Sequence, residues 1–254
     1  MKVTEDRLTI GGRAHTIDEV EDVCNLGLPF AEISLDEPGQ VEKEFDALKS
    51  LQARYGIMYL AHYPNEGNPF DTETLKKEFV PKIKKLLYLS KKLDISKGTI
   101  HFWMDKRWAG KELIEKKIFL LRDMVDYAEE QGITLCIENL SERFESFQKA
   151  FEEIPALRMT LDIGHGQLLS SENTSYGFMR QAFEKIAHIH IHDNHGGTGV
   201  KDDQHLCLGQ GIINYQAIFK ELGEKGYRSS VTMEVKPQDM PETRQVIVRY
   251  LPGA

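Results

Sequence analysis

Two kinds of apolar pattern alternate along this chain. Short runs rich in β-branched residues predict strands, and stretches with an apolar residue every three to four positions predict amphipathic helices. The expected strands lie at residues 7–10, 29–35, 57–63, 98–103, 133–139, 158–163, 186–193 and 229–235. The expected helices lie at about 17–26, 41–54, 72–93, 111–130, 143–153, 176–184, 214–225 and 240–250. Each helix except the last returns the chain to the start of a parallel strand.

Eight strands that alternate with helices predict an α/β protein, a single-domain (β/α)₈ TIM barrel over residues 1–254. The length agrees, since such barrels take about 250 residues. Pro81 should kink or divide the helix at 72–93, because proline cannot continue a helical hydrogen-bond ladder. Residues 193–212 hold five glycines and no helical period, which predicts a long functional loop after the seventh strand.

The composition argues against several classes of protein. Lys and Arg number 32 against 40 Asp and Glu, a formal net charge of −8, which argues against a surface that grips nucleic acid. Cys24, Cys136 and Cys207 lack the CxxC spacing of a zinc knuckle, and we expect them to be small buried residues. The first residues do not resemble a signal peptide, and no apolar run is long enough to span a membrane. We therefore expect a cytoplasmic protein with no membrane partner.

Metal-binding types of side chain recur where the predicted strands end. They are His62, His101, Glu138, Asp162 with His165, His190 and Glu234. In a parallel barrel these strand ends meet at one mouth. A buried carboxylate in an apolar strand nearly always has a partner. Three of the predicted strands end in one, namely Glu138, Asp162 and Glu234. A cation would relieve their repulsion, and mixed imidazole and carboxylate ligands suit zinc, manganese, iron or cobalt better than calcium.

The segment IAHIHIHD carries three further candidates. Alternation puts His188, His190 and His192 on one side of the strand, where at most one or two can reach a metal. His188 is expected deeper in the barrel. His195 lies in the glycine-rich loop and is expected to be solvated. Glu32 receives a low rank, because the sequence does not tell whether its side of the second strand looks into the barrel.

Aromatic and basic residues near the predicted strand ends could contact a substrate. Trp103 and Trp108 follow the fourth strand and could cover the face of a sugar ring, or pack on a helix instead. Lys236 and Lys201 could bind a phosphate or carboxylate group, although exposed lysines are usually solvated. These residues therefore carry weaker signals than the histidines and carboxylates.

Several motifs together are specific for one family. They are AHYP (61–64), IHFW (100–103), IENL (137–140), LDIGH (161–165), HIHD (190–193), DQHLCLGQG (203–211) and MEV (233–235). Through them the chain resembles the xylose isomerase-like TIM barrel superfamily, which includes sugar and sugar-phosphate isomerases and epimerases and also endonuclease IV, of AP endonuclease family 2. The resemblance to single-metal epimerases implies an ion on Glu138, Asp162, His190 and Glu234, with the two glutamates also serving as acid and base. His165 would then be a polar contact.

The resemblance to endonuclease IV implies a different, three-zinc site. Its three ligand groups would be His62, His101 and Glu138; Glu138, Asp162, His190 and Glu234; and His165, Asp203 and His205. The glycine-rich stretch that follows the Glu138 position in that nuclease is replaced here by LSERFESF. This departure, and the absence of clustered Lys and Arg, make nucleic acid the less expected partner.

We expect an isomerase or epimerase that uses one to three divalent ions, zinc or manganese, on a small sugar, sugar phosphate or related polyol or keto compound. The expected substrate contacts are His62, His101, His165, Trp103 and Lys236. The alternative is a multi-zinc phosphodiester hydrolase, which needs all nine ligands. The substrate and the oligomeric state, a homo-oligomer included, stay open at this point.

Overall fold

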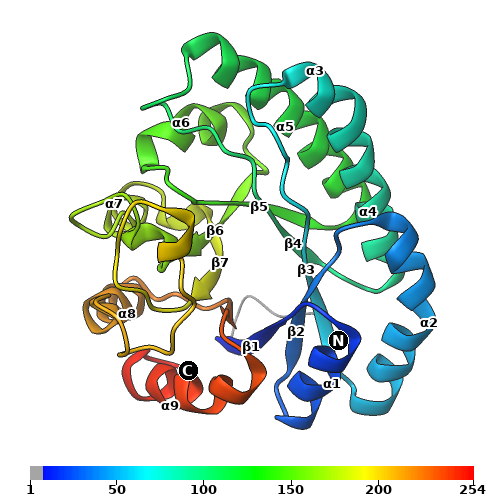
Figure 1. Ribbon diagram of the computed structural model, residues 1–254, viewed down its shortest axis with the longest axis vertical. Coiled ribbons are helices and arrows are strands. Elements are labelled where there is room, and N and C mark those ends of the chain that lie inside the picture. The colour runs from blue at the N-terminus through cyan, green and yellow to red at the C-terminus, as the bar shows by residue number, and fades with distance from the viewer. Residues whose placement is uncertain (1–7) are drawn as a thin grey trace.

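The computed structural model describes residues 8–254, and its eight strands close into a parallel barrel surrounded by helices (Figure 1). The strands pair in sequence order, and β8 pairs back to β1. They are β1 (Thr9–Ala14), β2 (Phe30–Ser34), β3 (Met58–His62), β4 (Lys97–Ile100), β5 (Thr134–Glu138), β6 (Arg158–Asp162), β7 (Ile186–Ile191) and β8 (Ser230–Met233). The predicted (β/α)₈ TIM barrel is therefore confirmed.

The helices surround the barrel, and the longer ones bury apolar stripes against its outside. They are α1 (Ile17–Asn25), α2 (Pro38–Tyr55), α3 (Thr72–Thr74), α4 (Val80–Lys92), α5 (Lys111–Gln131), α6 (Phe144–Glu153), α7 (Ser175–Gln181), α8 (Tyr215–Glu224) and α9 (Met240–Tyr250). In α5 the buried stripe includes Ile118, Leu121 and Val125, three and four positions apart. Gly132 ends this helix with a φ of 74°, a left-handed conformation that glycine adopts without strain.

The helix predicted at 72–93 is divided, as its proline suggests, but without a break in the helical backbone. A π-helical turn, Leu75–Phe79, joins α3 to α4, and the Val80 N–H donates to the Leu75 carbonyl five residues earlier. Pro81 then lies in the first turn of α4, where the fixed φ of proline suits the start of an α-helical segment. The proline thus changes the type of helix at this point instead of ending it.

The first strand extends farther than the sequence predicts. The prediction ended it at residue 10, and Arg7 lies outside the described residues, but β1 continues through Gly11, Gly12 and Arg13. A Cβ at Gly11 would come within 2.4 Å of the Phe30 ring, and one at Gly12 within 2.4 Å of the Met240 sulfur. Both glycines therefore mark close packing within a strand and not its end.

Polar side chains line the barrel interior along its whole length. The closed end is the end where the strands begin, opposite the mouth. At the closed end, the Lys97 ammonium is buried and donates to the Ala187 carbonyl at 2.6 Å and to the Ser229 and Ser230 hydroxyls at 2.9 Å each. The Thr99 and Thr160 hydroxyls, 2.8 Å apart, form a hydrogen bond farther along. These buried polar groups are satisfied internally, as a stable core requires.

The cysteines and the loop after β7 agree with what the sequence predicts. Cys24, Cys136 and Cys207 are buried, and within residues 8–254 none of them forms a disulfide. No helix of the described chain is both long enough and apolar enough to cross a membrane. The loop after β7 contains one short 3₁₀ turn, Val200–Asp202, and is otherwise irregular.

Candidate metal centre

The carboxyl ends of four strands bring together the four residues expected to hold one ion. Glu138 ends β5, Asp162 ends β6, His190 lies near the end of β7, and Glu234 directly follows β8. The strand register places Asp162 directly beside His190. All four side chains are buried. The structure thus brings these four residues together at the mouth of the barrel, and their role as metal ligands stays a prediction.

Three carboxylates surround one imidazole nitrogen. The Nδ1 atom of His190 lies 3.0 Å from Glu138 Oε1, 3.3 Å from Glu234 Oε1 and 3.8 Å from Asp162 Oδ2. Burial alone would lower the pKa of His190, but the surrounding glutamates Glu234, Glu32 and Glu138 raise it well above its ordinary value. The mouth therefore favours positive charge at the point where these four side chains meet.

The donor set fits a divalent transition metal. Asp162 Oδ2 is buried and has no hydrogen-bond partner among the residues that the structure describes. An unsatisfied buried acceptor costs about 1–3 kcal/mol, and more when it is charged. A cation would supply the missing partner, and mixed carboxylate and imidazole donors suit zinc, manganese, iron or cobalt. His62, His190 and Glu234 also hold donor atoms within 4.8 Å of one another.

A second group of donors shares Glu138. Its Oε2 atom lies 2.8 Å from His101 Nε2 and 3.3 Å from His62 Nε2. The Nδ1 atom of His62 donates to the Tyr63 carbonyl at 3.1 Å, so in the neutral ring Nε2 carries the lone pair. That lone pair faces a carboxylate oxygen, an arrangement that a proton or a metal ion between the two atoms stabilises.

A third group joins the end of β6 to the loop after β7. Asp203 Oδ2 lies 3.3 Å from both His165 Nε2 and His205 Nε2. In each histidine Nδ1 donates to a backbone carbonyl, that of Asn139 for His165 and that of Glu234 for His205. Burial would lower the pKa of His205, but the Asp203 carboxylate raises it to about 9. All nine residues implied by the resemblance to endonuclease IV therefore gather in three adjoining groups.

The Asp193 carboxylate helps to hold the two ends of the long loop together. Asp193 Oδ1 accepts from the backbone N–H groups of Asn194 and Ile213, and Oδ2 accepts from that of Gly209. His205, in the same loop, has a φ of 48°, which is uncommon for a residue other than glycine. Such local strain persists where the surroundings impose it and often accompanies a functional site.

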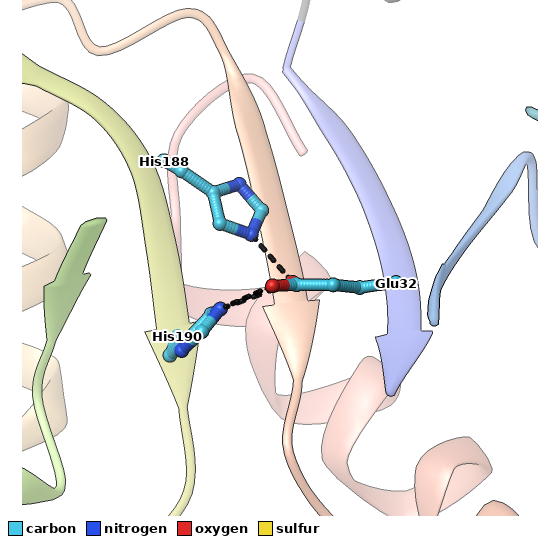
Figure 2. A group of neighbouring side chains, drawn as sticks. All are labelled: Glu32, His188 and His190. Carbon is cyan, nitrogen blue, oxygen red and sulfur yellow. Dashed lines mark hydrogen bonds and ion pairs between the residues drawn. The ribbon is translucent and has the colours of Figure 1, made fainter. Parts of the chain in front are cut away.

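Glu32, which the sequence reasoning ranked low, lies between two histidines of β7 (Figure 2). Its carboxylate accepts from His190 Nε2 at 3.0 Å, from His188 Nε2 at 2.8 Å and from the Thr232 hydroxyl at 2.6 Å. Burial would raise the pKa of Glu32, but the facing rings of His190 and His188 lower it well below its ordinary value. This contact turns Nδ1 of His190 toward the mouth. His188 lies deeper in the barrel, as expected.

Arg13 and His192 also lie beside the carboxylates of the mouth, although the sequence assigns neither of them a role. Arg13 is buried on β1, and its Nε lies 3.4 Å from Glu234 Oε1. Because β1 was predicted to end at residue 10, Arg13 was not considered as a barrel residue. His192 follows β7 and is fully buried, with its Nε2 3.2 Å from Asp162 Oδ1. The alternation in IAHIHIHD places His192 on the same side of the strand as His190, but it does not tell which of the two is the better candidate ligand.

The expected substrate contacts border two separate cavities. A cavity of about 720 Å³ is lined by Trp103, Trp108 and Phe70 together with His101 and His165. The rings of Trp103 and Trp108 are stacked 6.5 Å apart, and Phe70 lies 5.4 Å from Trp103. Lys236 instead lines a smaller cavity of about 170 Å³, beside Glu234 and His205. His62 lines neither of them.

A closed parallel barrel with histidines and carboxylates gathered at the carboxyl ends of its strands defines a TIM-barrel protein. The chain belongs to the xylose isomerase-like TIM barrel family, whose profile matches residues 20–249. A protein of Methanocaldococcus jannaschii described as uncharacterized is 29% identical over 219 residues, which cover 81% of each chain.

Two solved structures share the fold at lower identity. One is described as a D-tagatose 3-epimerase-like protein, with 24% identity, a TM-score of 0.82 and coverage of 96% of this chain and 97% of the other. The second is the IOLI protein with a binding zinc atom, with 19% identity, a TM-score of 0.78 and coverage of 96% and 99%. At these identities the likeness shows the fold.

Proposed function

We propose that this protein is a divalent-metal-dependent isomerase or epimerase of a small sugar, sugar phosphate or related polyol or keto compound. The observation that carries the proposal is the convergence of Glu138 and Glu234, from strands on two sides of β7, on the same nitrogen of His190, at 3.0 and 3.3 Å. The names of the similar structures, one epimerase-like and one with a zinc atom, support the same class.

The proposed reaction needs two carboxylates at one carbon centre. Glu138, Asp162, His190 and Glu234 would hold a divalent ion, which would supply a Lewis acid to acidify the C–H beside a substrate carbonyl. One glutamate removes that proton. The other, which is also ionised, first takes up a proton from solvent and then returns it to the same carbon from the other side, or to the neighbouring carbon. Burial would raise the pKa of Glu234, but the adjacent His190 lowers it to about 2, so this carboxylate is ionised and can act as a base.

The remaining contacts would select the substrate. His62, His101 and His165 lie beside the two glutamates and would hold substrate hydroxyl groups. Trp103 would cover an apolar face of the sugar, since its ring lines the larger cavity next to His101. Lys236 would bind an anionic group at the smaller cavity beside Glu234.

Solvent deuterium exchange tests the proposed chemistry even while the product of the reaction is unidentified. Protein reconstituted with zinc or manganese should incorporate deuterium beside the carbonyl of at least one compound in a panel of ketoses, ketose phosphates and inososes in D₂O, as followed by NMR. Metal-free protein is the control. If no compound exchanges above that control while the metal is bound, the isomerase proposal is wrong.

The Glu32→Gln variant should bind the metal about 10–100-fold more weakly, because loss of the partner of a ligating histidine typically has this effect. Glutamine keeps the volume but removes the charge that accepts from His190. Isothermal titration with zinc measures the affinity, and the exposed Glu130→Gln variant on α5 is the matched control. Unchanged affinity in Glu32→Gln would show that Glu32 does not position His190 for metal.

Phosphodiester hydrolysis is a second candidate, which the third donor group favours. A single-metal epimerase does not require Asp203 and His205, yet Asp203 faces His165 and His205 at 3.3 Å each. Cleavage of a duplex with one abasic site, compared with an intact duplex, tests this activity. About three zinc ions per chain, with fewer in His205→Ala, together with cleavage would favour the hydrolase. About one ion, unaffected by that substitution, and no cleavage would favour the isomerase.

A further inference from the structure

His192 is a buried histidine whose ring nitrogens lack hydrogen bonds. Its side chain is fully buried, and neither Nδ1 nor Nε2 has a hydrogen-bond partner in the part of the chain that the structure describes. Buried polar groups are nearly always paired, and an orphaned one calls for an explanation such as an ion. The residue follows β7 and belongs neither to the four residues around His190 Nδ1 nor to the two other donor groups.

The Nε2 atom of His192 faces two carboxylates. It lies 3.2 Å from Asp162 Oδ1 and 3.8 Å from Asp203 Oδ1, without hydrogen-bond alignment to either oxygen. Asp162 Oδ1 accepts one backbone N–H, from His165, and keeps a second lone pair. Asp203 Oδ1 is itself buried and has no hydrogen-bond partner within residues 8–254. His192 Nε2 and Asp203 Oδ1 therefore lack hydrogen bonds, and His192 Nε2 lies beside both Asp203 Oδ1 and the free lone pair of Asp162 Oδ1.

The spacing of these donor atoms suits a metal ion. In a tetrahedral zinc site with bonds of about 2.0–2.1 Å, neighbouring ligand atoms lie about 3.3–3.4 Å apart. The two distances from His192 Nε2 to the carboxylate oxygens bracket that value. Asp203 uses its other oxygen, Oδ2, toward His165 and His205. Its Oδ1 is thus a separate donor.

The ring of His192 is held in this orientation by its neighbours. A Cβ at Gly164 would lie 2.0 Å from His192 Cε1 and 2.2 Å from Nε2, so only glycine leaves room for the ring. On one face the ring stacks on His205, with centroids 4.1 Å apart and an interplanar angle of 18°. The DIGH motif therefore accommodates His192 as well as supplying Asp162 and His165.

We propose that His192, Asp162 and Asp203 hold a second divalent transition-metal ion beside the one on Glu138, His190 and Glu234. Asp162 would bridge the two ions, because Oδ1 faces His192 while the orphaned Oδ2 faces His190 at 3.8 Å. This inference rests on the proposed metal centre and adds His192 as a ligand. It differs from the ligand groups implied by the resemblance, none of which includes His192.

Zinc stoichiometry of ring-preserving variants tests this second site. His192→Phe keeps an aromatic ring and removes both nitrogens, and Gly164→Ala retains the imidazole but displaces it from its position. After equilibration with zinc chloride and desalting, mass spectrometry of metals should find about one zinc ion fewer per chain in each variant than in the wild type. His195→Phe, at an exposed histidine of the same loop, is the matched control and should keep the wild-type value.

The outcomes separate this inference from the proposed function. Equal zinc content in the wild type, His192→Phe and Gly164→Ala would overturn the second site and leave the first one standing. Absence of zinc from the wild type would overturn both. If His192→Phe does not fold, as judged by circular dichroism, the zinc content of Gly164→Ala decides alone.

Discussion

The Glu138→Gln variant should lose at least about 10³-fold in turnover and most of its metal affinity, because one substitution removes a proposed ligand and a proposed acid–base group. Glu138 is completely buried at the end of β5. One of its oxygens faces His101 and His62, and the other faces His190 and His165. Glutamine retains one acceptor oxygen but presents an amide to the histidines on the other side. Turnover in the exchange assay and zinc titration measure the two effects.

The matched control for this prediction is Glu130→Gln, at an exposed glutamate on α5, which should keep wild-type turnover. Thermal unfolding of the metal-free variants separates loss of chemistry from loss of fold. A Glu138→Gln protein that folds and retains more than about a tenth of wild-type turnover would exclude Glu138 from the acid–base role.

The Lys117→Met variant should lower the free energy of unfolding by about 3–5 kcal/mol, because it leaves a buried carboxylate unpaired. Lys117, on α5, is completely buried, and its ammonium lies 2.5 Å from Glu66 Oε2. The other oxygen of Glu66 accepts from the Trp103 backbone N–H at 2.7 Å. Loss of the lysine charge should therefore also loosen the segment that carries Trp103. Urea unfolding measures the change.

Two further variants make this prediction specific. Lys116→Met, at the exposed neighbour on the same helix, should change the free energy of unfolding by less than about 1 kcal/mol, since exposed ion pairs contribute little. The double variant Lys117→Met with Glu66→Gln should recover much of the loss, because no charge then remains buried alone. Equal effects of Lys116→Met and Lys117→Met would contradict the importance of the buried pair.

The residues at the strand ends could be predicted from the sequence, because each is a polar residue at the end of a short apolar run. Glu138, Asp162 and Glu234 each end an apolar run, and a buried carboxylate there requires a partner. Since the strands run in one direction, that requirement places the partners at the same mouth. The four residues expected around a single ion do meet there, and their roles as ligands stay a proposal.

The residues that contact the four side chains at the mouth could not be predicted in the same way. Glu32 lies in the middle of its strand, and alternation alone does not tell which face looks into the barrel. Arg13 follows two glycines that resemble a turn in sequence but pack closely against Phe30 and Met240. For His192 the deciding facts are the space left by Gly164 and the stacking on His205, which only the packed structure reveals.

The loop after β7 was predictable as a functional segment but not in its geometry. Its length and glycine content indicated function, and family motifs supplied Asp203 and His205 as candidates. Their positions depend on the backbone hydrogen bonds to Asp193 and on the left-handed conformation of His205. Neither feature follows from residue spacing.

The metal centre is tested most directly by anomalous diffraction at the zinc edge from crystals of zinc-loaded wild-type protein. We expect a strong peak bounded by Glu138, Asp162, His190 and Glu234, the residues whose donor atoms converge at the mouth. Loss of that peak in Glu138→Gln crystals would support the ligand set. Zinc bound only elsewhere on the wild-type protein, or absent from it, would contradict the proposed metal centre.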